Sequence, residues 1–185
     1  MPLVEITPGP SGLLIDLAYA RPDNVTGRAI YARARCLLHP DAAALLDRAA
    51  ELALPQGLRL KIFDAYRPPE AQWVLWTAFP DSQFVADPRR GSPHSRGVAV
   101  DLTLVDAAGR DLEMGTRFDD FTDASHHGSA KVSPEAQRNR ALLLGLMTAA
   151  GWDFYRNEWW HYQLFKAASY PLISDNALAE GLMAA

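Results

Sequence analysis

The strongest constraint on the fold comes from two strand-like segments that each carry a potential metal ligand. In the first, residues 98–104, apolar side chains alternate with others that include Asp101, and His94 precedes this segment in a Ser-Pro-His-Ser-Arg-Gly turn. The second, residues 159–165, carries His161 near its start. Two imidazoles and one carboxylate can hold zinc and leave a fourth position open for water. His161 lies on a different strand from Asp101, so it could complete the site from a neighbouring strand.

Glu158 stands three residues before His161 and beside two tryptophans. An odd separation puts side chains on opposite faces of an ideal strand, so we expect a bend before the strand if Glu158 is to face the metal. A carboxyl group among large apolar groups has its pKa moved toward neutral pH. The pattern favours a general base that passes a proton from the attacking water to the leaving amine. The alternative is a surface carboxylate at the start of a strand.

Arg67 has two interpretations that the spacing leaves open. It follows the alternating segment 58–62, and a salt bridge to Asp64 or Glu70 would account for it. It could instead be a fixed cation that polarises a scissile carbonyl and stabilises the resulting oxyanion. The adjacent pair at 126–127 is a poor candidate for one metal, because neighbouring histidines point apart in an extended chain. His39, just before a helix start, is expected to be structural.

Bulk properties exclude several classes of function. The chain has 185 residues, of which 49% are hydrophobic, and a net charge of −4, so we expect one globular domain that does not bind nucleic acid. Cys36 is the single cysteine, which excludes an internal disulfide and a cysteine metal site, and we expect it half-buried in a strand. We find neither a signal peptide nor a membrane-spanning run, so the expected location is cytoplasmic, without membrane association.

Periodicity predicts an α+β fold with a mostly antiparallel central sheet flanked by helices. Strands are expected at residues 30–38, 58–62, 98–104 and 159–165, and helices at 40–54, 67–78 and 133–150. The tryptophans of the second helix, Trp73 and Trp76, are expected in the core. A single domain is expected over residues 1–185, with flexible ends at about 1–12 and 170–185.

Several motifs in order resemble the VanX-type D-alanyl-D-alanine dipeptidases, zinc enzymes related to zinc D,D-carboxypeptidases. The resemblance runs from about residue 16 to 165. The His-to-Asp segment is shared with the wider carboxypeptidase group. More specific to the dipeptidases are Met-Gly-Thr-Arg-Phe-Asp at 114–119, Ser-His-His at 125–127 and Glu-Trp-Trp-His at 158–161. The resemblance implies the zinc D,D-peptidase or hedgehog-like fold.

The resemblance also implies roles for individual residues. One zinc ion per chain would be held by His94, Asp101 and His161. Glu158 would be the general base and acid, and Arg67 the cation that stabilises the transition state. The implied reaction is hydrolysis of D-Ala-D-Ala to two D-alanines by a metal-activated water.

The same resemblance implies a substrate pocket lined by Ser92 and Tyr19, in which Asp119 meets the free ammonium of the dipeptide. A dipeptidase must recognise both ends of its substrate, so an anion for the amine is chemically reasonable. The chain departs from the family pattern in a short stretch between residues 76 and 92 and in Val25, where an aromatic residue is common. We expect these departures to alter the depth or entrance of the pocket.

Other functions on the same scaffold stay open at this point. One is a D,D-carboxypeptidase or peptidoglycan endopeptidase, and another is a non-catalytic zinc-binding module. A dipeptidase could serve glycopeptide resistance or the scavenging of cell-wall dipeptide, and one sequence does not separate these. The expected partner is a small dipeptide; the sequence leaves the oligomeric state open.

Overall fold

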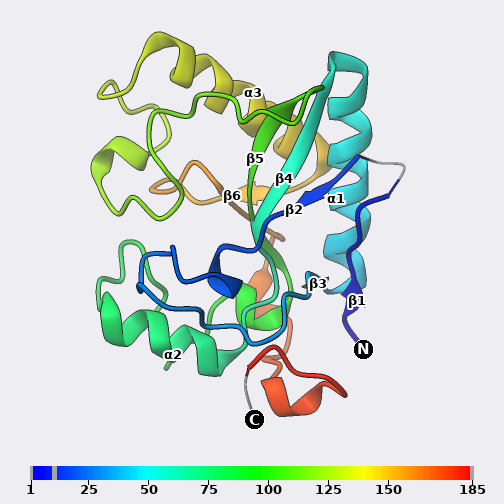
Figure 1. The fold of residues 1–185 in the computed structure, drawn as a ribbon, viewed down its shortest axis with the longest axis vertical. Helices are drawn as coiled ribbons and strands as arrows, with labels where there is room; N and C mark the ends of the chain where they lie inside the picture. Colours follow the sequence, from blue (N-terminus) through cyan, green and yellow to red (C-terminus); the bar gives the residue numbers. More distant parts are fainter. Residues whose placement is uncertain (1, 10–11, 184–185) are drawn as a thin grey trace.

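The centre of the molecule is a five-stranded sheet with the strand order β2-β4-β5-β7-β6 (Figure 1). The computed structural model describes residues 2–9 and 12–183. Strand β2 runs parallel to β4, and the other neighbouring pairs are antiparallel. The strands of this sheet are β2 (Leu14–Ile15), β4 (Leu58–Asp64), β5 (Ala99–Asp106), β6 (Asp153–Phe154) and β7 (His161–Gln163). The predicted α+β class with a mostly antiparallel sheet is confirmed.

Two long helices, α1 (Pro40–Ala53) and α3 (Pro134–Ala150), pack against each other and against the sheet (Figure 1). The α1 helix begins where the ring of His39 accepts a hydrogen bond from the backbone N–H of Asp41, so this histidine is a helix cap. The α3 helix ends at Gly151, whose φ of 108° needs a residue without a side chain. The main hydrophobic core lies between these helices and the sheet.

The third helix, α2 (Pro69–Ala78), corrects one prediction about the core. Its buried positions are Ala71, Gln72 and Leu75, whereas Trp73 is 48% exposed. Trp76 is partly buried against a second apolar cluster. The helix is short and presents only one narrow stripe to the protein, so a run of large apolar residues cannot all lie inside.

The predicted strand over residues 30–38 is also wrong for most of its length. Only β3 (Leu37–Leu38) forms there, paired with β1 (Val4–Glu5) in a separate two-stranded sheet. The backbone N–H groups of Ala32 and Arg33 instead donate to the carbonyl of Leu182. This part of the chain therefore contacts the C-terminal segment and does not join a sheet.

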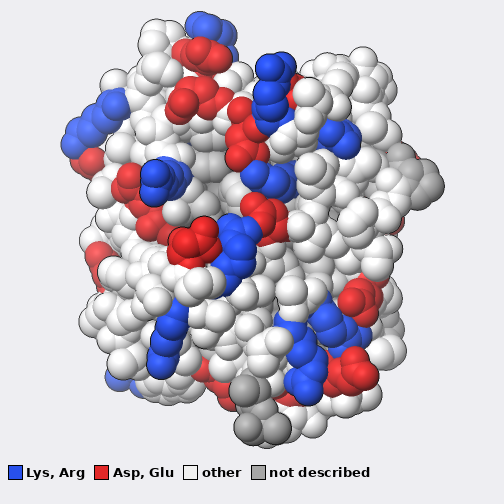
Figure 2. All heavy atoms as spheres, viewed as in Figure 1, with Lys and Arg blue, Asp and Glu red and all other residues white. Residues whose placement is uncertain are grey.

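Cys36 lies just outside that strand and is fully buried, not half-buried as predicted. The single domain with flexible ends stays a prediction, and residues 1, 10–11 and 184–185 of those ends lie outside the described residues. Within the described chain, no helix is long and apolar enough to cross a membrane. Acidic and basic side chains are interspersed on the face shown in Figure 2, with no continuous basic area.

The register of the sheet places three polar residues in one row. Asp64 of β4 pairs with Asp101 of β5, which pairs in turn with His161 of β7. A bulge between Ile62 and Asp64 shifts the register of β4 by one residue. Without it, Phe63 would stand opposite Asp101, so the bulge brings the carboxylate of Asp64 into the row. This row is the foundation of the candidate site.

Candidate metal-centred active site

The three predicted metal ligands converge on one point. The Nδ1 atom of His161 is 3.0 Å from Oδ1 of Asp101 and 3.1 Å from Nε2 of His94, and that Nε2 is 3.3 Å from Oδ2 of Asp101. Ligand atoms around a tetrahedral zinc ion lie about 3.3 Å apart, given bond lengths of about 2.0–2.1 Å. The donor set and its spacing therefore fit a zinc ion with one open position.

Each histidine has a second contact that fixes the nitrogen offered to the metal. Nδ1 of His94 lies 2.6 Å from the carbonyl oxygen of Ala65, and Nε2 of His161 lies 3.1 Å from Oε1 of Gln163. In metal sites the ring N–H usually donates to such an oxygen and leaves the other nitrogen free to bind. His94 begins a short 3-10 turn that ends at Gly97, where a Cβ would lie 2.5 Å from Leu3. Gly97 also has a φ of 68°, a left-handed conformation that favours glycine.

Asp101 is ionised at this position. Burial alone would raise its pKa, but the imidazoles of His94 and His161 outweigh burial and hold the pKa below its usual range. A carboxylate is the form that binds a metal.

Glu158 lies in the turn before β7, as the predicted bend requires. One carboxylate oxygen is 4.0 Å from Nδ1 of His161, and the side chain is 7% exposed. Burial raises its pKa well above the usual range, the carboxylates of Asp101 and Asp119 raise it further, and Arg67 opposes them. A buried carboxyl group beside the candidate metal ligands has the position that a general base and acid would need.

Arg67 forms the salt bridge to Asp64 that was one of its two interpretations, and its role as a catalytic cation stays a prediction. Its Nε atom donates to Asp64 at 2.8 Å, Nη1 to Gln72 at 3.1 Å and Nη2 to Asp101 at 3.2 Å, so the guanidinium is fixed within the site. Glu70 is not its partner and accepts a hydrogen bond from Ser174 instead. The salt bridge is what holds the cation in place.

The structure places Asp119 and Tyr19 together on the same side of the site. The Tyr19 hydroxyl donates to Oδ2 of Asp119 at 2.8 Å, and the guanidinium of Arg67 lies 5.0 Å from the centre of the Tyr19 ring. Asp119 has a φ of 59°, which aspartate and asparagine tolerate better than most residues. Burial raises the pKa of Asp119 to about 7, although Tyr19 and Arg67 oppose this shift.

These side chains line a cavity of about 220 Å³. Pockets for drug-sized ligands span about 300–1,000 Å³, so this cavity fits a smaller molecule. Ser92 lines it too, although its hydroxyl also accepts the backbone N–H of His94 at 3.2 Å. The stretch between residues 76 and 92 borders one side of this cavity. Within it, Phe84 stacks on Phe121 with 5.4 Å between ring centres, and the carbonyl of Gln83 accepts a hydrogen bond from the Tyr155 hydroxyl.

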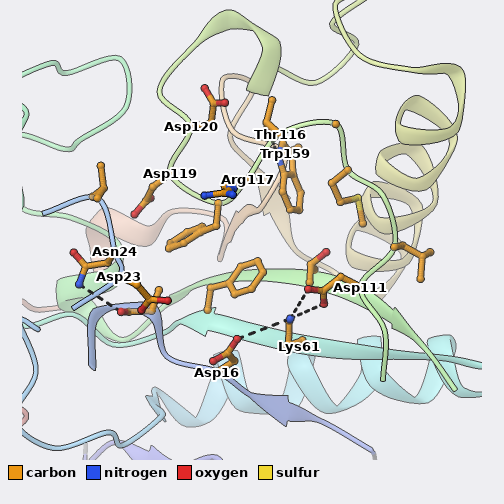
Figure 3. A pocket seen from close by; sticks show the side chains of 18 of the residues that line it. Asp16, Asp23, Asn24, Lys61, Asp111, Thr116, Arg117, Asp119, Asp120 and Trp159 are labelled. Atoms are coloured by element: carbon orange, nitrogen blue, oxygen red, sulfur yellow. Dashed lines mark hydrogen bonds and ion pairs between the residues drawn. The ribbon is translucent and has the colours of Figure 1, made fainter. Parts of the chain in front are cut away.

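A larger hollow of about 950 Å³ shares Asp119 with the small cavity, and Figure 3 shows the side chains that line this hollow. Figure 3 shows Lys61 between Asp16 and Asp111, and its ammonium lies 2.6 Å from one oxygen of Asp111. Val25, one of the departures from the family pattern, lines this hollow rather than the small cavity. The hollow contains none of the convergent metal ligands, so the chemistry belongs to the smaller cavity.

Sequence reasoning missed several polar residues that support the site. Gln72 is buried and links Arg67 to the carbonyl of Ala86, and Gln163 supports His161. A polar residue in an otherwise apolar helix stripe was the available signal for Gln72. His127 lies outside the group of convergent ligands, and burial lowers its pKa to about 4, so it is neutral near pH 7.

A buried carboxyl group that shares a cavity with a cluster able to hold a metal ion is an arrangement typical of metallopeptidases. The model of the M15 peptidase family described as D-Ala-D-Ala dipeptidase matches residues 2–178. The D-alanyl-D-alanine dipeptidase of Escherichia coli (strain K12) is 52% identical over 163 residues, covering 88% of this chain and 84% of that protein. The chain therefore belongs to the D-Ala-D-Ala dipeptidase family.

More distant relatives agree in name. The D-alanyl-D-alanine dipeptidase of Enterococcus faecium is 34% identical over 181 residues, covering 86% of this chain and 89% of that protein. Among solved structures, an L-Ala D-Glu endopeptidase of Serratia marcescens matches with a TM-score of 0.46 and 15% identity, covering 71% of this chain and 84% of that chain.

Proposed function

We propose that the chain hydrolyses D-Ala-D-Ala to two D-alanines, with one zinc ion held by His94, Asp101 and His161. The observation that carries the proposal is the convergence of these ligands with Glu158 in a cavity of about 220 Å³. Membership of the family and the names of the relatives support the choice of substrate. When bound, a zinc ion would polarise the scissile carbonyl and make water a better nucleophile at neutral pH.

Glu158 accepts a proton from the attacking water and returns it to the nitrogen of the leaving D-alanine. Burial raises the pKa of Glu158, which favours the protonated form that carries the proton between the two steps. Arg67 stabilises the negative charge that develops on the carbonyl oxygen of the substrate, because Asp64 and Gln72 fix its orientation before substrate binds.

Asp119 binds the free ammonium of the dipeptide, and Tyr19 and Ser92 line the pocket around the substrate. The neutral form of the carboxyl group loses its proton when a cation binds, since its pKa of about 7 lies close to physiological pH. A free ammonium is present in a dipeptide and absent at the corresponding position of a longer peptide. Asp119 and the small volume of the cavity therefore select together for a short substrate.

The proposal extends to the setting of the reaction, which we place in the cytoplasm. The buried, unpaired thiol of Cys36 is compatible with a reducing compartment. Fractionation of cells that express the tagged chain tests this location, and recovery outside the cytoplasmic fraction would contradict it.

The experiment that tests the function measures D-alanine release from D-Ala-D-Ala, from its N-acetyl derivative and from a pentapeptide ending in D-Ala-D-Ala. Each substrate is assayed with the zinc-loaded protein and after zinc removal by chelation. We expect cleavage of the free dipeptide alone, lost with the metal and restored by zinc. Cleavage of the pentapeptide would indicate a D,D-carboxypeptidase or endopeptidase, and no cleavage by folded, zinc-loaded protein would indicate a non-catalytic zinc module.

A further inference from the structure

Arg140 is a buried arginine of helix α3 that belongs to neither cavity. It is 3% exposed, and its guanidinium makes close contacts with neutral groups. Nε donates to the carbonyl of Met114 at 2.6 Å, and Nη1 donates to the carbonyls of Ala124 and His126 at 2.8 and 3.2 Å. Nη2 lies 3.3 Å from the hydroxyl of Thr116. The four hydrogen bonds of this buried charge all go to backbone and hydroxyl oxygens, which indicates a specific structural task.

The first task concerns the loop from residue 114 to residue 126. The guanidinium binds carbonyls near both ends of this loop and so holds the ends at a fixed separation. Ser125 contributes to the same closure, since its hydroxyl lies 3.0 Å from that of Thr116 and donates to the carbonyl of Asp120 at 2.6 Å. Asp119, the proposed acceptor of the substrate ammonium, lies inside the closed loop.

The second task concerns the turn that carries Glu158. The backbone N–H of Trp159 donates to the carbonyl of Ser125 at 3.1 Å, and the N–H of His127 donates to the carbonyl of Arg156 at 2.9 Å. These bonds attach both sides of the turn to the segment whose carbonyls Arg140 holds.

The Trp159 side chain supplies a further link between the turn and the loop. Its indole N–H donates to the hydroxyl of Thr116 at 2.8 Å, and Figure 3 shows these two side chains together. The guanidinium of Arg140 lies 5.7 Å from the centre of the Trp159 ring. The general base and the ammonium acceptor are therefore attached to the same guanidinium through separate connections.

We propose that Arg140 is a positioning residue that sets Glu158 and Asp119 relative to each other while lying outside the substrate cavity. The inference rests on the proposed function, because it uses the roles given there to these two carboxylates. Arginine suits the task because its planar fork can bind several oxygens at fixed angles. Lysine keeps the charge but offers its donors from a single atom, so it cannot reproduce the same closure.

The experiment compares Arg140→Lys and Arg140→Gln with the wild type and with Arg138→Gln, an exposed arginine on the same helix. All four proteins are checked for folding by circular dichroism and for zinc content before kinetic assay. We expect Arg140→Gln to raise KM for D-Ala-D-Ala and lower kcat, each by about tenfold or more. Arg140→Lys should recover only part of the loss, and Arg138→Gln should match the wild type.

The decisive readout is discrimination between D-Ala-D-Ala and its N-acetyl form. If Asp119 is displaced, the ratio of Ki for the N-acetyl form, assayed as a competitive inhibitor, to KM for D-Ala-D-Ala falls, whereas a loss of folded enzyme leaves both constants unchanged. Unchanged discrimination with normal KM in folded, zinc-loaded Arg140 variants would overturn the inference. Wild-type protein that fails to discriminate would instead overturn the proposed function.

A second variant keeps the test valid if both Arg140 substitutions prevent folding. Thr116→Val removes the hydroxyl that accepts from Trp159 and contacts Arg140, while leaving the guanidinium bonds to backbone carbonyls in place. We expect a fall in kcat of about tenfold, because the Trp159 side chain next to Glu158 loses its anchor. Wild-type kcat and KM in this folded variant would contradict the inference.

Discussion

Replacing Asp119 by asparagine should weaken catalysis and stabilise the protein at the same time. Asparagine tolerates the positive φ of 59° at this position, and its amide oxygen can accept the Tyr19 hydroxyl, so the local structure should persist. A hydrogen bond to a charged group contributes about 1.5–3 kcal/mol. Loss of the ammonium contact should therefore lower kcat/KM for D-Ala-D-Ala by about 10- to 150-fold.

The effect on stability follows from the pKa of the Asp119 carboxyl group. Burial raises this pKa from 3.8 to about 7 in the folded state. A group with a raised folded-state pKa contributes stability that is fully present below its unfolded pKa and is lost as the pH rises through the folded pKa. Above pH 7 the wild type must hold an unfavourable buried carboxylate, whereas asparagine has no charge to hold.

The magnitude has an upper limit set by the size of the pKa shift. A change from 3.8 to about 7 corresponds to roughly 4 kcal/mol at 1.36 kcal/mol per unit. Part of the Asp119 residue is exposed to solvent, and solvent screens its charge. We therefore expect the asparagine variant to gain only about 1–2 kcal/mol of unfolding free energy. The gain should appear at pH 8 and shrink as the pH falls toward 5.5.

The assay combines urea unfolding of the metal-free proteins at several pH values with kinetics of the zinc-loaded proteins. Asp120→Asn is the matched control, because Figure 3 shows the side chain of Asp120 directed away from that of Asp119. This neighbour should change kcat/KM by less than about threefold. An Asp119→Asn protein with wild-type kcat/KM, or with no pH-dependent gain in unfolding free energy, would refute the reasoning.

Three further substitutions test the remaining parts of the site and fold. Glu158→Gln should retain zinc and lower kcat by about 10²–10⁴, as metal analysis and D-alanine release will show; unchanged turnover would remove this residue from the mechanism. Arg67→Lys should lower kcat by about 10²–10³ while the exposed Arg89→Lys leaves it unchanged, and equal rates for both would exclude a role for the guanidinium. Leu46→Ala should lower the free energy of unfolding in urea by about 2–5 kcal/mol, because Leu46 is fully buried. Leu52→Ala, at an exposed position of the same helix, should lower it by less than about 1 kcal/mol, and similar losses for both would contradict the assignment of the core.

Periodicity in the sequence was sufficient to predict the long elements, because their apolar faces pack on one core. The helix over 133–150 and the strand through Asp101 occur close to their predicted bounds. The prediction of a strand from residue 30 was wrong because this segment pairs with the C-terminal chain around Leu182. No local sequence pattern indicates that contact. The prediction that Trp73 lies in the core was wrong because large apolar residues also occur on protein surfaces.

The candidate site shows a similar division. The ligand types and the bend at Glu158 could be predicted, since a metal requires certain donors and a strand alternates its side chains. The contributions of Gln72 and Arg140 could not, because each acts through backbone carbonyls or another side chain that lies far away in the sequence. Their patterns resemble those of ordinary helix residues until the three-dimensional partners are known.

The bulge in β4 explains why the site needs a sheet rather than a set of loops. Strand pairing sets Asp101 and His161 side by side on one face at a spacing that a metal can use. The bulge adds Asp64 to that row, and Asp64 then anchors Arg67 at 2.8 Å, so the cation approaches the ligands at a fixed angle. Because these side chains are already held in place, they need little reorganisation when the substrate reacts. Fixed charges lower the activation barrier most under this condition. The residues that we propose to bind substrate occupy loops around this row. There the hydrogen bonds of Arg140 would supply the rigidity that strand pairing gives to the candidate metal ligands.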